Sequence, residues 1–434
     1  MAPKVRAEKV HEDYLETLAT GKTFRLGFLL GIAENTCGFE GIVVHMAPLP
    51  FNEDDEKHPA SLDDVDTEEI VLHAINLTRM LPGCFTVMGL FVVSPVNVFE
   101  DEGQRKKLVD IVNKVQEQFR QNPFLMATQG DEKNFLVLGY TTGKPCVCQQ
   151  ILKGKVVDVD FCAKGLTWRT LEPNLIVEEN FELEKIGDTC SIEGSVQKIL
   201  GKISQQLEEA YIVRPGQKGQ ELGKVQEDDL VDMLFSQDDD IQTTSLKFFM
   251  KDKDDVEDAK VTDGTVQISG KICCFVSVPS QTKLSVVETY IRKDFIRSLA
   301  GRLQLYCDTL AEGKIKMENL IDLHNDTPRR IFFTVQPTGV QFSDYLFPGE
   351  NDDTVRENVK KLMGIDLDPT DIYLWVEDGD DMDPQQEDDF ENSTEANRDY
   401  GRDSFKYIAV SSVIVILFSI YIMFFWYSPQ GDYY

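Results

Sequence analysis

The sequence predicts a mixed fold of the α/β or α+β class, followed by a single membrane anchor at the C-terminus. Apolar strand-like runs alternate with segments of helical periodicity as far as residue 376. The last 30 residues instead contain a long uninterrupted apolar stretch. These observations divide the chain into five parts: a first α/β domain (1–170), a β-rich and helical connector with an acidic loop (171–245), a second α/β domain (246–376), an acidic tether (377–404) and an anchor (405–434).

The elements of the first domain follow from periodicity and from turn residues. The segment 63–81 opens on acidic N-cap residues, repeats apolar side chains at helical spacing and stops at Pro82-Gly83. The segment 102–122 also has one apolar face. The expected order is a helix (11–20), two strands (23–34 and 41–50), a helix (63–81), a strand (84–94), a helix (102–122) and a hairpin (133–152).

Periodicity and turn residues also predict the elements of residues 171–376. The segment 214–243 is polar and acidic and is expected to be a loop. Around it we expect a strand (174–183), a helix (195–211), a long strand (266–279), a helix (283–310), a strand (329–337) and a closing helix (353–364).

Charge and cysteine content exclude several classes of function. The chain has 44 basic and 75 acidic residues, a net charge of −31, whereas a nucleic-acid-binding protein needs a cationic face. Its nine cysteines include no CxxC pair, and most lie in apolar runs, as expected of buried reduced thiols. With five histidines and none at zinc-finger spacing from a cysteine, we expect no metal and no cofactor.

The stretch 407–427 is 21 residues long and contains no charge. At about 1.5 Å per residue a helix of this length spans roughly 31 Å, the thickness of the hydrocarbon core of a bilayer. Tyr407 lies at one edge, and Trp426 and Tyr427 lie at the other, where amphipathic rings prefer the interface. The alternative is a buried core helix, but the segment has no polar face.

The anchor is expected to leave the bulk of the protein in the cytosol. Arg402 and Lys406 flank its N-terminal side, and positively charged flanks stay cytoplasmic. The glycosylation sequons at Asn76 and Asn392 should therefore remain unmodified. Between body and anchor, residues 377–403 hold twelve acidic and two basic residues, which predicts a solvated tether, or alternatively a binding segment for a basic partner.

The first domain resembles the MPN fold, which metal-dependent deubiquitinating peptidases and their inactive relatives share. The resemblance lies in "FRLGFLLG" (24–31) and "GLFVVSP" (89–95). In active members these blocks and the following helix supply a glutamate base, two histidines, a serine and an aspartate around zinc. The matching positions here are Phe24, Val92, Ser94, Glu102 and Arg105. The resemblance therefore implies a pseudo-enzyme without catalytic or metal-binding residues.

Other candidates for chemistry are weaker. His58 has no second histidine nearby in sequence and fits a loop, while His73 lies near the apolar face of a helix and fits a packed side chain. A pairing of Cys84 with a histidine stays open, although a thiol entering a buried strand is normally inert. No phosphate-binding loop or nucleophile-elbow motif is present.

The chain as a whole resembles the odorant-response-abnormal protein four (odr-four) homologue family. The matching blocks are 57–83, which ends on "RMLPG", 89–94, 286–302, 329–335 with 342–350, and the C-terminal anchor. The resemblance implies a protein of the endoplasmic reticulum membrane that assists folding or delivery of G-protein-coupled receptors. It also implies a partnership with the ubiquitin-fold-modifier-specific cysteine protease.

Together with the predicted anchor, the resemblance implies a tail-anchored, non-catalytic adaptor that recruits this protease to the endoplasmic reticulum membrane. The alternative is a trafficking chaperone for odorant and other G-protein-coupled receptors. MPN domains often pair, so we expect a partner surface on the helix 63–81, with Arg79, Leu77 and Met80 as candidate contacts. The competing expectation is that Leu77 and Met80 pack inside their own domain.

Overall fold

The computed structural model contains a closed barrel, a six-stranded sheet and a three-stranded sheet. The residues described are 4–21, 23–33, 41–50, 59–126, 135–163, 165–182, 185–186, 189–190, 192–213, 229–235, 243–249, 265–312, 320–323 and 325–373. The tether, the predicted membrane span with Tyr407, Trp426 and Tyr427, and His58 lie outside them. Within these ranges, no helix is long and apolar enough to cross a bilayer.

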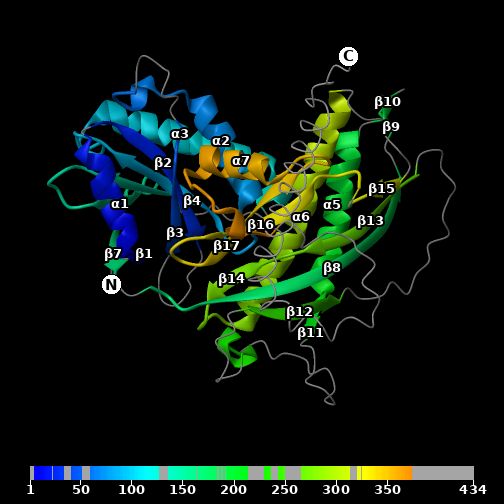
Figure 1. The fold of residues 1–434 in the computed structure, drawn as a ribbon. Helices are drawn as coiled ribbons and strands as arrows, with labels where there is room; N and C mark the ends of the chain where they lie inside the picture. Colours follow the sequence, from blue (N-terminus) through cyan, green and yellow to red (C-terminus); the bar gives the residue numbers. More distant parts are fainter. Residues whose placement is uncertain are drawn as a thin grey trace, which may run out of the picture. The chain divides into compact units, whose positions relative to one another are not determined.

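The N-terminal part is a closed barrel of seven strands (Figure 1). Their order around the barrel is β1 (Lys4–Glu8), β3 (Gly41–Pro48), β2 (Arg25–Ile32), β4 (Thr86–Val93), β5 (Leu136–Tyr140), β6 (Val147–Gln150) and β7 (Lys155–Cys162). β1 closes the barrel, because it pairs in parallel with both β3 and β7. Neither β1 nor β7 was expected from the sequence.

Helices cover the barrel strands on two sides. They are α1 (Lys9–Thr20), α2 (Thr67–Met80), α3 (Glu102–Gln121) and the short α4 (Pro123–Met126). Alternate residues of β2 belong to two apolar clusters: Phe28 lies in the cluster with α2 and α3, and Leu29 lies in the cluster with α1. Because both faces of β2 and β4 are buried, these strands read as continuous apolar runs in the sequence.

A second, six-stranded sheet contains β8 (Trp168–Glu182), β11 (Tyr211–Val213), β12 (Thr243–Phe249), β13 (Thr265–Cys273), β14 (Val276–Pro279) and β15 (Leu320–Asp322). Two helices, α5 (Ile192–Glu209) and α6 (Leu284–Ala311), pack against each other beside this sheet (Figure 1). The short strands β9 (Lys185–Ile186) and β10 (Thr189–Cys190) pair separately. The predicted strand 266–279 is interrupted opposite Pro173, which has no N–H to donate to the ladder.

A three-stranded sheet completes the body: β17 (Val340–Leu346), β16 (Arg329–Val335) and β18 (Ile372–Tyr373). The last helix is α7 (Asp352–Met363), and short 3₁₀ turns cover Leu62–Asp64, Val231–Leu234 and Pro369–Asp371. The expected mixture of helices and strands is confirmed.

One apolar cluster contains core residues from both predicted α/β domains. Phe28 of the barrel, Leu171 of β8 and Phe342 of β17 all belong to it. The boundaries expected at residues 170 and 245 therefore fall inside a continuous core, and we expect that the pieces do not fold independently.

Candidate functional site

The positions that match the metallopeptidase site are packed or solvated, and they do not form a cluster of metal donors. Phe24 and Val92 are 2% and 0% exposed and lie in the apolar cluster with α2 and α3. Ser94 follows β4, where its hydroxyl accepts a hydrogen bond from the Val96 N–H. Glu102 and Arg105 are exposed on the first turn of α3. The described residues contain no group of three or more metal-ligating side chains.

A hollow of about 140 Å³ lies beside Ser94. It is lined by Ala19, Thr23, Val93, Ser94, Pro95 and Thr142. This lining offers three hydroxyl groups but no titratable side chain. A hydroxyl needs an adjacent base to become a nucleophile. The lining of this hollow therefore lacks the groups that hydrolysis would need.

The candidate partner contacts on α2 do not form an exposed surface. Leu77 and Met80 are 0% and 1% exposed and pack in the main core, which counts against their contacting a partner. Arg79 is half-buried, and its Nη1 lies 3.4 Å from the Asn76 Oδ1. Burial lowers the pKa of Arg79, and Asp308 on α6 partly offsets this effect. The exposed apolar side chain on α2 is Leu72.

The sequon at Asn76 lies inside this helix. Its threonine, Thr78, is 0% exposed and donates a hydrogen bond to the Ala74 carbonyl. Glycosylation sequons are used in surface loops. The fold therefore gives a second reason to expect no glycan there, besides the predicted cytosolic location.

The turn after α2 packs closely against α6. Pro82 disfavours helical geometry at the residue before it, and the chain turns into β4 through Gly83. A Cβ atom on Gly83 would lie 2.3 Å from the Asp294 nitrogen and 2.3 Å from the Tyr290 oxygen, both in the backbone of α6. Glycine is therefore required here by the close approach of two backbones.

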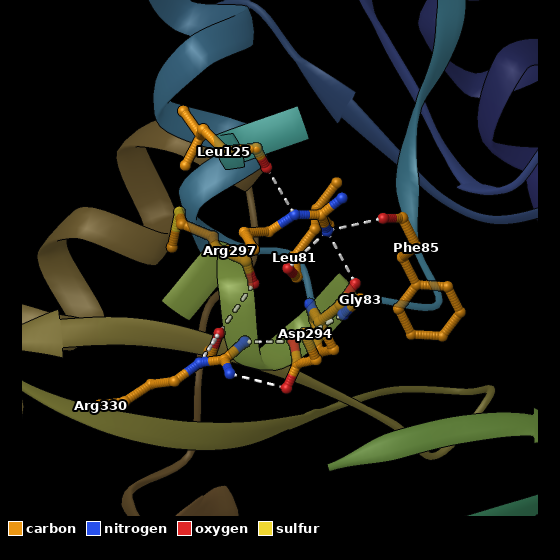
Figure 2. Close-up of polar contacts among 10 residues, drawn as sticks. Leu81, Gly83, Phe85, Leu125, Asp294, Arg297 and Arg330 are labelled. Carbon is orange, nitrogen blue, oxygen red and sulfur yellow. Dashed lines mark hydrogen bonds and ion pairs between the residues drawn. The ribbon is translucent and has the colours of Figure 1, made fainter. Parts of the chain in front are cut away.

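Arg297 of α6 holds this turn from inside the protein. Its guanidinium donates 2.9 Å hydrogen bonds to the carbonyl oxygens of Leu81, Pro82 and Phe85 and, through Nε, to Leu125 (Figure 2). The side chain is 1% exposed. Burial lowers the pKa of Arg297 to about 10, partly offset by Asp294, so the side chain stays charged at neutral pH. The carbonyl dipoles take the place of water around the cation.

Asp294 precedes Arg297 on α6 by one helical turn. It connects the loop after α2 to β16. Its carboxylate accepts the Gly83 N–H at 2.6 Å and both terminal nitrogens of Arg330 at 2.8 and 3.0 Å (Figure 2). Arg330 Nε donates to the Ser343 hydroxyl, which donates to the Met80 carbonyl. Burial alone would lower the pKa of Arg330, but attraction to Asp294 and Tyr345 and the hydrogen bonds to Asp294 together outweigh burial and raise that pKa. We call Gly83, Asp294, Arg297, Arg330 and Ser343 the buried polar cluster.

The cysteines beside this cluster are not poised as nucleophiles. Cys84 and Cys274 are both buried, and burial raises the pKa of each thiol well above its usual value. Only the thiolate reacts as a nucleophile. Both thiols are therefore protonated at neutral pH, which fits the expected inert, reduced cysteines.

Two histidines from the first part of the chain cap a helix near the end of the body. His73 Nε2 lies 2.9 Å from the Leu362 carbonyl, and His45 Nε2 lies 2.9 Å from the Met363 carbonyl. These carbonyls end α7, where they have no intrahelical partner. Burial lowers the pKa of both histidines to about 4, so both are neutral donors at pH 7. His73 is thus a packed histidine, as expected.

Sequence reasoning missed the buried polar cluster. One signal was available: Asp294, Arg297 and Arg302 lie within an otherwise apolar stretch of the helix 283–310. Charges inside a helix that is apolar on every side are expected to be paired or hydrogen-bonded in the interior. The partners themselves could not be identified, because they lie as far as 216 residues away along the chain.

A family model described as "Odorant response abnormal 4-like" matches residues 27–374. The chain belongs to this family. A Drosophila melanogaster protein named "Protein odr-4 homolog" is 24% identical over 437 residues and covers 86% of this chain and 87% of its own length. Homologues of the same name from Mus musculus and Homo sapiens are each 21% identical, with 85% of both chains covered.

A solved structure entitled "Crystal structure of UfSP from C. elegans" overlays on 87% of this chain with a TM-score of 0.49 and 10% identity. The overlay covers 60% of the UfSP chain, so this protein spans about three fifths of that chain's length.

Four of the sequence blocks that carry the odr-4 resemblance meet at the buried polar cluster. "RMLPG" contains Gly83, the block 286–302 contains Asp294 and Arg297, and the blocks 329–335 and 342–350 contain Arg330 and Ser343. The resemblance inferred from these blocks is confirmed by the family match. Physically, these blocks form one buried network, in which the polar groups of one block are hydrogen-bonded by groups of another.

Proposed function

We propose that the protein is a non-catalytic, tail-anchored adaptor that recruits a ubiquitin-fold-modifier-specific protease to the endoplasmic reticulum membrane. The observation that carries this proposal is membership of the odr-4 family across residues 27–374. The curated relatives are named as odr-4 homologues, and their names designate no enzyme. The residues at Phe24, Val92, Ser94, Glu102 and Arg105 support a role that does not depend on hydrolysis.

The proposed mechanism is tethering. The charge-free stretch 407–427 supplies the anchor, with the bulk of the chain on the cytosolic side. A protease bound to the folded body would be confined near membrane substrates, and its effective concentration there would rise without new catalytic contacts. Pairing between the pseudo-MPN barrel and an MPN-like region of the protease is the proposed mode of binding.

The partner surface on α2 needs a revised form, since Leu77 and Met80 are buried. A partner that binds this helix would contact its exposed positions, such as Leu72, together with the half-buried Arg79. Replacing Leu72 with aspartate should weaken binding of the protease without lowering the melting temperature, because the side chain is 62% exposed.

The second candidate is a chaperone for folding and delivery of odorant and other G-protein-coupled receptors. The family description, "Odorant response abnormal 4-like", favours it. The two functions predict different partners. Purification of the full chain in mild detergent, followed by mass spectrometry, should give one soluble protease in near-stoichiometric amount if the protein is an adaptor. A set of polytopic membrane proteins without that protease would reject the adaptor and favour the chaperone.

A further inference from the structure

The turn between β6 and β7 exposes aliphatic and cationic side chains together. Leu152 and Val156 are 45% and 56% exposed, and Lys153 and Lys155 are exposed between them. Gly154 turns the chain with a φ of +63°. Exposed large aliphatic side chains next to lysines are typical of surfaces that lie on membranes.

Helix α3 adds positive charge to the same place. The Nη2 of Arg105 lies 4.0 Å from the position that a Cβ on Gly154 would occupy, so the guanidinium reaches the turn. We call Arg105 and the segment 152–156 the basic tip. Its lysines at 153 and 155 also have partners within the chain, and their exposed side chains still contribute positive charge.

The basic tip differs from the other exposed hydrophobic positions of the described residues. Those positions are Val10, Leu72, Val96, Ile176 and Met233, and each has a carboxylate within four residues in sequence. Leu152 instead has two lysines and no carboxylate within four residues. Val156 has Asp158 and Asp160 within four residues, but these stand opposite Lys4 and Arg6 in the β1–β7 ladder. The chain has a net charge of −31, so exposed aliphatic side chains beside lysines are unusual in it and indicate a binding surface.

We propose that the basic tip docks on the anionic cytosolic surface of the membrane that holds the anchor. Negative lipid headgroups attract clustered lysine and arginine side chains, and the two aliphatic side chains can enter the headgroup boundary. The 33 residues from 374 to 406 can extend at most about 120 Å, so the anchor would keep the body within that distance of the surface. Confinement of this kind makes a weak contact effective. This inference rests on the membrane anchoring in the proposed function.

The experiment uses the full chain reconstituted into vesicles with about 30% phosphatidylserine and acyl-brominated lipids, which quench nearby tryptophan. L152W places a tryptophan in the basic tip. I176W is the matched control, because Ile176 is 67% exposed on β8 but is flanked by glutamates. The tryptophan fluorescence of the unmodified chain gives the background for both variants.

We expect the added tryptophan of L152W to be quenched at least twofold more than that of I176W. The difference should disappear in vesicles without anionic lipid and in about 0.5 M salt, which screens surface charge. K153E/K155E added to L152W should abolish it as well. K114E/K144E is the matched control for charge, because it changes the net charge equally at two lysines outside the basic tip. Their side chains are 43% and 51% exposed, and this variant should leave the quenching unchanged.

Two outcomes separate the basic tip from the anchor. A chain that floats with vesicles in high salt but shows equal quenching at residues 152 and 176 overturns the basic tip and leaves the anchor standing. In that case the tip is covered by something other than lipid, such as the acidic tether or an acidic protein. A chain quenched at residue 152 but released from vesicles by salt supports the tip and contradicts the anchor.

Discussion

At the scale of single residues, Asp294 is the group on which the interior most depends. Its carboxylate is fully buried and accepts hydrogen bonds from Gly83 and from Arg330, whose side chain is also 0% exposed. Breaking a buried ion pair by removing one partner leaves an uncompensated charge, which typically costs about 3–5 kcal/mol. Exposed pairs contribute about 0–1 kcal/mol. The cluster should therefore dominate the response to charge substitutions.

D294N is expected to lower the free energy of unfolding by about 3–5 kcal/mol, because Arg330 would lose its counter-charge inside the protein. Denaturant titration followed by circular dichroism measures the change. The control is E68Q, which breaks the exposed pair with Lys114 and should cost less than about 1 kcal/mol. Equal effects of the two substitutions would show that the cluster is not a tightly coupled ion pair.

Gly83 provides a steric test at the same scale. G83A places a Cβ 2.3 Å from two backbone atoms of α6, so the turn and the helix must separate and the protein should be destabilised by more than about 2 kcal/mol. Gly103 is the matched control, since it is exposed on α3 and an added Cβ would lie 3.2 Å from the Asp101 Oδ1. G103A should be neutral or stabilising by up to about 1 kcal/mol, because alanine favours helix. Comparison of the melting temperatures of G83A and G103A measures this difference in stability.

At the scale of elements, the sequence predicts those helices and strands that are specified by nearby residues. The helices α2, α3, α6 and α7 and the strands β2, β3 and β4 lie within a few residues of the expected segments, because capping, periodicity and Pro-Gly stops are read directly from the sequence. β1 was missed because "KVRAE" is short and half polar, and its role appears only when it pairs with β3 and β7. The buried polar cluster was missed for the same reason, since each partner is far away along the chain.

The contact between α7 and the barrel should respond to pH. His45 and His73 have a pKa of about 4 in the folded protein, below their usual 6.5. The unfolded chain binds the proton more tightly than the folded chain does. The contribution of the two neutral histidines to the free energy of unfolding is therefore complete above pH 6.5 and is lost as the pH falls towards 4. Each histidine should cost about 2 kcal/mol of stability at pH 5 relative to pH 7.5.

Denaturant titrations at the two pH values measure this loss. H45Q/H73Q keeps an amide donor at both positions and removes the titration, so its stability should change less between pH 7.5 and 5 than that of the parent. A parent protein whose pH dependence matches that of the double variant would contradict the assignment of both histidines as buried neutral donors.

At the scale of the whole molecule, the predicted domains share one apolar core. Residues on both sides of the boundary at 170 belong to it, and the buried polar cluster joins α2 to α6 and β16. Fragments 1–170 and 171–376 expressed separately should therefore fail to fold, while their co-expression should give a soluble complex. Well-dispersed amide spectra from either fragment alone would instead support the independent domains inferred from the sequence.

The central claim is that the protein brings a soluble protease to a membrane without catalysing a reaction itself. Membrane fractionation of cells that express either the full chain or a chain ending at residue 404 tests it most directly, with the ubiquitin-fold-modifier-specific protease followed in each fraction. We expect the full chain to hold the protease in the membrane fraction. The truncated chain should move to the soluble fraction and still co-purify with the protease. A protease that stays in the membrane fraction with the truncated chain, or that co-purifies with neither form, would contradict the claim.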